Sequence, residues 1–212
     1  MLFRSHRLIV NSQTYRQRSD HDEAKSTIDS DNTLLWRMNR RRLEAEEIRD
    51  AIMFVSDSLN LTMGGPGYRL FELERPEHSP HYEYHKFDHR DASTHRRSIY
   101  RFIVRSQPDP WMTTMDCADS SQSTPVRDET LTALQSLSLL NNQFNLVMAE
   151  RFERALGGKP SMSEKVRLAF TRAMQREPSK SDHQAMLQYA RQHGLNNLCR
   201  LLFNFSEFIY ID

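Results

Sequence analysis

The sequence predicts a mainly α fold with a C-terminal helical bundle, a short two-stranded β element and long irregular connectors. Apolar residues recur at helical spacing in four successive stretches of the C-terminal half. Two short runs in the N-terminal half instead alternate aromatic and β-branched residues, as strands do. The chain has 212 residues, 38% hydrophobic and 27% charged, which is enough to bury a core. We therefore expect residues 1–212 to form a single domain.

In the N-terminal half, residues 2–15 predict a short helix, and residues 19–33 are so polar that they predict an exposed loop. The clearest helix spans residues 41–59, where the apolar positions are Leu43, Ile48, Ile52, Val55 and Leu59. Glycines and a proline at 64–67 end this region. The strand-like runs, 68–73 and 98–104, flank a histidine-rich stretch at 77–95 that predicts a second exposed loop.

Residues 107–127 carry three prolines and many Ser, Thr and Asp residues, which predicts an irregular connector. Four helices are expected after it. Ser161 stands three residues before Glu164, a capping-box spacing at the start of the second of these helices. The predicted helical ranges are 128–156, 161–176, 181–193 and 195–208.

The bulk properties exclude several classes of partner. A formal net charge of +1 and a pI near 7.9 favour neither nucleic acid nor an anionic surface. No apolar run approaches the ~20 residues of a membrane span, and the first residues lack a signal peptide's apolar stretch. Cys117 and Cys199 have no neighbouring cysteine to make a zinc or haem-attachment spacing. The chain alone therefore predicts no cofactor and indicates no compartment.

Eight strings in order resemble the planctomycete domain of unknown function numbered 1553. They are HRLIVNSQTYRQ at 6–17, RRRLEAEEIRDAI at 40–52, LTMGGPG at 61–67, RRSIYRF at 96–102, MDCAD at 115–119, LQSLSLLNNQF at 134–144, AFTRAMQREPS at 169–179 and LLFNFSEFIYID at 201–212. Ala118 and Ser136 are mild departures from the family pattern, where proline and alanine are common.

The resemblance implies a context that composition does not show. Family members end long exported or periplasmic proteins of planctomycete type, after a companion planctomycete cytochrome-type domain and often a haem-binding cytochrome c domain. The companion domain is therefore the expected partner, and haem is expected only upstream in the parent protein. Because the family domain normally extends upstream of the first string, the chain is expected to be an N-terminally truncated fragment. The resemblance implies no established activity.

Two groups of charged residues are candidates for a site. Arg42, Glu46, Arg49 and Asp50 occupy adjacent helical positions, where a carboxylate beside an arginine serves as a base or orients a substrate. The alternative is a salt-bridged helix face. In the connector, Asp116 and Asp119 flank Cys117, with Arg97 and Arg127 on either side in sequence. These residues would hold a hard cation or a polar substrate, or else cap turns and pair with arginine.

The third candidate is a set of histidines. His78, His81, His85, His89 and His95 would share a face if their segment were helical, and neutral imidazole is a common metal ligand. Pro80 and the charged residues around it favour an exposed loop instead. The metal candidates are His78, His81, His85 and His89.

The favoured function is a C-terminal accessory or interaction module. The first alternative is part of an enzyme, a hydrolase or redox enzyme, whose site would use Arg49, Asp50, Arg97, Asp116 and Asp119. In that case these five side chains should converge in one pocket. The second alternative is a metal-binding module that uses the histidines.

Overall fold

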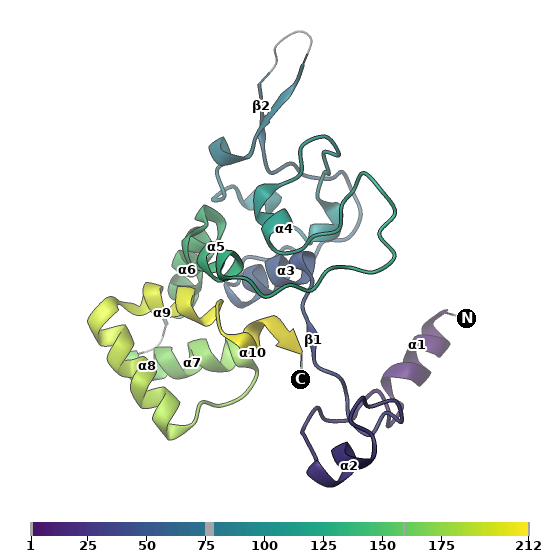
Figure 1. The fold of residues 1–212 in the computed structure, drawn as a ribbon. Coiled ribbons are helices and arrows are strands. Elements are labelled where there is room, and N and C mark those ends of the chain that lie inside the picture. The colour runs from purple at the N-terminus through teal and green to yellow at the C-terminus, as the bar shows by residue number, and fades with distance from the viewer. Residues whose placement is uncertain (1, 75–78, 159, 212) are drawn as a thin grey trace. The chain divides into compact units, whose positions relative to one another are not determined.

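The computed structural model of the chain describes residues 2–74, 79–158 and 160–211. These residues form ten α-helices, three short 3-10 helices (η1–η3) and two two-stranded antiparallel sheets, which confirms the mainly α fold (Figure 1). They divide into two compact units, residues 1–42 with 210–212 and residues 43–209. Each unit is described by itself.

The smaller unit contains α1 (Leu2–Val10), α2 (Glu23–Ile28) and the sheet of β1 (Arg41–Arg42) with β4 (Tyr210–Ile211). Arg41 pairs with Ile211 and Arg42 with Tyr210. The helix predicted near the start of the chain is present as α1. The stretch predicted as a loop, 19–33, is largely exposed but contains α2, because the Asp22 side chain accepts a hydrogen bond from the Lys25 N–H and caps that helix.

The larger unit is built around α3 (Ala45–Val55), where Ile48, Ile52 and Met53 are fully buried. Glu44 and Glu47 form a capping box at its start. The helix is shorter than the range 41–59. It ends early because Asp57 adopts a left-handed backbone, φ 57°, and turns the chain. The N-terminal half thus supplies the central helix of this unit.

The β pairing differs from the prediction. β2 (Glu72–Glu74) pairs with β3 (His81–Glu83), inside the stretch predicted as a loop, and the predicted strand runs 68–73 and 98–104 meet at an isolated parallel bridge between Tyr68 and Arg101. Ser98–Tyr100 form η3 instead, because Asp50 binds both the N–H and the hydroxyl of Ser98. The 77–95 stretch also contains η1 (Tyr84–Lys86) and η2 (Ala92–Thr94). Its residues 77 and 78 lie outside the described residues.

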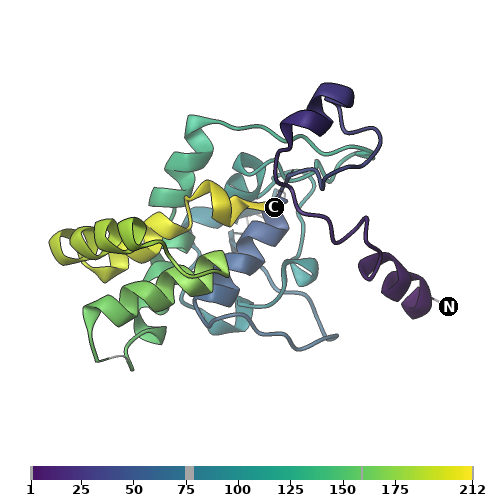
Figure 2. The same ribbon diagram turned by 90° about the horizontal axis from the view of Figure 1, so that it is seen from below.

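The C-terminal half is a helical bundle, as predicted, but its first helix is two. α5 (Ala133–Asn141) and α6 (Gln143–Ala155) are separated at Asn142, whose extended backbone breaks the helix and whose side chain caps α6. The other elements are α4 (Pro110–Thr114), α7 (Met162–Met174), α8 (Lys180–His193), α9 (Leu195–Leu202) and α10 (Ser206–Ile209). Helices α7, α8 and α9 lie side by side (Figure 2).

The bundle core is aromatic and aliphatic. Phe152 of α6 stacks on Phe203 at a ring-centroid distance of 6.0 Å, and Phe170 of α7 is also fully buried. The Ser161 side chain caps α7 by accepting the Glu164 N–H at 3.2 Å, as the sequence predicted. Among the described residues, no helix is long and apolar enough to cross a membrane.

Candidate functional site

Arg49 is the most buried ionic side chain of the larger unit, with 2% of its surface exposed. Its Nη1 donates to the Tyr68 hydroxyl at 2.8 Å and to the Arg96 carbonyl at 3.1 Å. Its Nη2 donates to the Thr94 carbonyl at 3.1 Å, and its guanidinium also lies over the rings of Tyr68 and Phe144. Burial lowers the pKa of Arg49, and these acceptors offset the loss of hydration. Arg49 therefore ties the 94–98 segment to α3.

Asp50 completes this arrangement from the next position of α3. Its Oδ1 accepts the Ser98 N–H at 2.8 Å and the Ser98 hydroxyl at 2.7 Å, and lies 3.9 Å from Arg49 Nη1. A carboxylate that already accepts these bonds next to a guanidinium is a strong anchor for the loop. Because these partners all lie within the chain, the Asp50 carboxylate is paired without a substrate.

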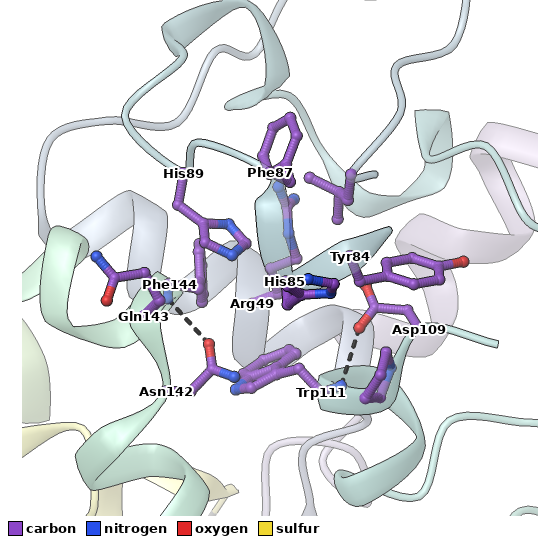
Figure 3. A pocket seen from close by; sticks show the side chains of 12 residues that line it. Arg49, Tyr84, His85, Phe87, His89, Asp109, Trp111, Asn142, Gln143 and Phe144 are labelled. Atoms are coloured by element: carbon purple, nitrogen blue, oxygen red, sulfur yellow. Dashed lines mark hydrogen bonds between the residues drawn. The ribbon is translucent and has the colours of Figure 1, made fainter. Parts of the chain in front are cut away.

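A cavity of about 290 Å³ opens beside Arg49 (Figure 3). Four aromatic side chains line it, Tyr84, Phe87, Trp111 and Phe144, and Trp111 and Phe144 contact each other edge to face at 5.4 Å. They come from η1, the turn after it, α4 and α6. Three segments that are distant in sequence thus meet in one aromatic pocket, which is the usual character of a small-molecule site.

His89 is a half-buried imidazole that lines this pocket. Its ring contacts Phe87 at 5.1 Å and Phe144 at 5.9 Å, edge to face. Burial, followed by the positive charge of Arg49, lowers its pKa from 6.5 to about 4. The imidazole is therefore neutral at pH 7. Figure 3 shows it directed toward the middle of the surrounding side chains.

Asp109 lies on the other side of the pocket and caps α4. Its Oδ1 accepts the N–H groups of Trp111 at 2.9 Å and Met112 at 3.3 Å. Burial raises its pKa, although Arg101 and these N–H groups act in the opposite direction. Burial also raises the pKa of Tyr84 to about 12, with the negative charge of Asp109 as the second cause. Perturbed groups that gather in one cavity are candidates for function.

Of the five predicted catalytic residues, Arg49 alone lines this cavity. Arg49 and Asp50 lie together, but Arg97 is exposed at the start of η3. Asp116, at φ 64°, binds the Thr130 N–H at 2.8 Å and the Gln135 amide at 2.9 Å, so it fastens the connector to α5. Asp119 is exposed and binds Ser121. The contacts that the structure gives Arg49, Asp50 and Asp116 stabilise the fold.

Glu46, predicted beside Arg49, belongs to a different cluster. It binds Arg127 at 2.7 Å and accepts the Cys117 thiol at 3.5 Å. Burial opposes ionisation of Glu46, but the bonds from Arg127 and the thiol outweigh it and lower the pKa. Burial and Glu46 raise the pKa of Cys117 to about 11, which keeps the thiol protonated. Arg42 lies in β1, in the other unit.

The histidines predicted as metal ligands are dispersed over β3, the 3-10 helix η1 and the turn after it. His81 is exposed on β3, His85 pairs with Glu83 at 3.1 Å, and His89 lines the aromatic pocket. His78 lies outside the described residues. Within the part of the chain that the structure describes, no three His, Cys, Asp or Glu side chains are placed to hold a metal ion.

Sequence reasoning missed Asp109, Trp111 and Phe144 as pocket residues. The signal available for Asp109 was the Asp-Pro pair at 109–110, typical of a helix start with an acidic cap. Nothing local in the sequence links it to residues 84–89 or to 142–144. Their meeting depends on how the connector packs against α6.

The fold thus defines the chain as a mainly α module. The ionic side chains of Arg49 and Asp50 bind loops of the same chain, and an aromatic pocket lies beside Arg49. The family model PSD1, protein of unknown function (DUF1553), matches residues 3–190, so the chain belongs to this family. This confirms the resemblance found in the sequence. Comparisons with curated proteins and with solved structures find no match.

Proposed function

We propose that the chain is an accessory module of a larger exported protein and packs against the companion domain of planctomycete cytochrome type. The observation that carries this proposal is a row of exposed leucines at and before α5. Leu131, Leu134 and Leu137 are 78%, 64% and 57% exposed, at a spacing of three residues. Contiguous exposed apolar side chains of this kind mark a surface that a partner covers.

The free energy of burying these leucines favours association with a partner. Burying a leucine fully contributes about 1.5–3 kcal/mol, so three leucines supply a substantial part of the free energy of a domain contact. The candidate polar residues support the same proposal, because Arg49, Asp50 and Asp116 are occupied by bonds within the chain. An exported or periplasmic location and haem in an upstream domain belong to this proposal through the family.

The test uses the chain with its companion domain, expressed together and analysed by size-exclusion chromatography and calorimetry. The double variant Leu134→Ser, Leu137→Ser should weaken association at least tenfold while leaving the melting temperature nearly unchanged. The matched control is Met63→Ser, an equally exposed apolar residue outside this row, and it should associate normally. Normal association of the double variant, or no association of the unaltered pair, would overturn the proposal.

A second function, part of an enzyme, is favoured by one observation. Neutral His89 and buried Asp109 line the same cavity, and such groups suit proton transfer. This site would differ from the Arg49, Asp50, Arg97, Asp116 and Asp119 set. A metal-binding module that uses the histidines stays a prediction, and metal analysis of the purified chain tests it.

A further inference from the structure

The aromatic pocket has room for one small ring. Its volume is about 290 Å³, and its wall is formed mainly by Leu70 and the rings of Tyr84, Phe87, Trp111 and Phe144. Trp111 and Phe144 are almost fully buried and contact each other edge to face at 5.4 Å. Edges and faces arranged in this way favour an aromatic guest through edge-to-face contacts.

In the part of the chain that the structure describes, the His89 imidazole is a polar group of this wall that has no partner, whereas the equally unpaired Trp111 Nε1 is fully buried and not accessible from the cavity. Within the described residues, the His89 imidazole contacts rings and forms neither a hydrogen bond nor an ion pair. A neutral imidazole carries one donor and one acceptor. The Asn142 carbonyl oxygen, by contrast, is occupied by the Phe144 N–H. His89 is therefore a polar group that a ligand in the cavity would satisfy.

The charges of the wall select against other ligands. The Arg49 guanidinium lies over the Phe144 ring at 5.4 Å and opposes a cation, and the Asp109 carboxylate, which also lines the cavity, opposes an anion, so the charges of the wall favour a neutral ligand. Arg49 Nη1 donates to Tyr68, Arg96 and Ser98 and its Nη2 to the Thr94 carbonyl, so the guanidinium offers little to an anion. A sugar carries several hydroxyls, and each one left unpaired against an apolar wall weakens binding by roughly tenfold.

We propose that this cavity binds a neutral aromatic ring bearing a single hydroxyl, with the hydroxyl bonded to the His89 imidazole and the ring enclosed by Tyr84, Phe87 and Trp111. This binding site is independent of the accessory role, because the leucine row on α5 does not line the cavity. The two proposals can therefore fail separately.

The test titrates 4-methylphenol into the chain carrying Trp36→Phe, which leaves Trp111 as its one tryptophan. A saturable change in Trp111 fluorescence, confirmed by calorimetry, is expected with a dissociation constant of about 1 mM or tighter for so small a ligand. Toluene, the same ring without the hydroxyl, should bind at least tenfold more weakly. Methyl glucoside should not compete.

Two variants, His89→Phe and Gln143→Trp, test whether the ligand binds in this cavity. His89→Phe keeps a ring but removes both nitrogens, so 4-methylphenol should bind at least tenfold more weakly while toluene binding is retained. The matched control, His81→Phe, alters an exposed histidine outside the cavity and should bind as the parent does. Gln143→Trp adds a large side chain at the exposed margin of the cavity and should prevent both 4-methylphenol and toluene from binding. This variant replaces His89→Phe as the test if His89→Phe does not fold.

The proposal is overturned by any of three results: no saturable binding of 4-methylphenol, unchanged affinity in both His89→Phe and Gln143→Trp, or equal affinity for methyl glucoside. Loss of ligand binding in these variants with normal companion-domain association would leave the accessory role intact.

Discussion

The Asp50 carboxylate holds Ser98 by two groups at once, accepting its backbone N–H at 2.8 Å and its hydroxyl at 2.7 Å. The two residues are 48 positions apart, so this contact closes the whole stretch that includes both strands of the hairpin and η1. This pair joins the loop region before Ser98 to the central helix α3.

Replacing Asp50 with alanine should therefore destabilise the fold. The change leaves the Ser98 N–H without its acceptor and removes the carboxylate nearest to Arg49, at a cost of about 2–4 kcal/mol. Urea unfolding followed by circular dichroism measures the loss. Asp119→Ala is the control, since that side chain is exposed and should change stability by no more than about 0.5 kcal/mol. A cost below about 1 kcal/mol at Asp50 would contradict the anchoring role.

Arg49→Met should cost more than the removal of a surface arginine. The variant removes a buried cation and strands the Tyr68 hydroxyl and two backbone carbonyls, with an expected loss of about 3–5 kcal/mol. Arg90→Met is the matched control, because Arg90 pairs with Glu150 at the surface, where such pairs contribute about 0–1 kcal/mol. Equal losses of unfolding free energy in Arg49→Met and Arg90→Met would show that the buried Arg49 bonds stabilise the fold no more than a surface ion pair does.

Stability should fall as the pH drops from about 6.5 towards 4. The folded pKa of His89, about 4, lies below its unfolded value of 6.5, because burial and Arg49 oppose the charged form. The unfolded chain therefore binds more protons in this window, and the stabilisation present above pH 6.5 is lost as protons bind. The pKa of His95 is lowered by burial in the same direction.

The size of the pH effect at His89 is at most about 3 kcal/mol, and is reduced because its ring faces a cavity open to water. Melting temperatures recorded from pH 7.5 to 4.5 should decline less steeply in His89→Phe than in the parent chain. The control His81→Phe should follow the parent. Parallel curves for all three proteins would refute this assignment.

Cys117 should react slowly with iodoacetamide. Burial and Glu46 raise its pKa to about 11, so at pH 8 its thiolate fraction is roughly a hundredfold below that of an ordinary cysteine. Mass spectrometry of the native chain should show slow labelling at Cys117, and the urea-unfolded chain supplies the reference rate. Rapid native labelling would place the thiol in a different environment.

The boundaries of single helices were readable from the sequence where a capping residue marked them, as Ser161 does for α7. The break at Asn142 was not readable, because the apolar pattern continues through it and only the cap geometry separates α5 from α6. The hairpin was assigned to the wrong second strand for a similar reason. Alternation predicts a strand but does not name its partner, and Asp50 held Ser98 in a 3-10 turn.

The sequence by itself determined the helical class, the family and the apolar face of α3, because helical periodicity, caps and ordered motifs are local properties of the chain. Only the tertiary structure decided that Arg49 and Asp50 are occupied within the fold, and that His89, Asp109 and Phe144 share a cavity. These are contacts between segments tens of residues apart. They form because burial of the aromatic side chains and pairing of buried charges select one packing, and no local pattern records that choice.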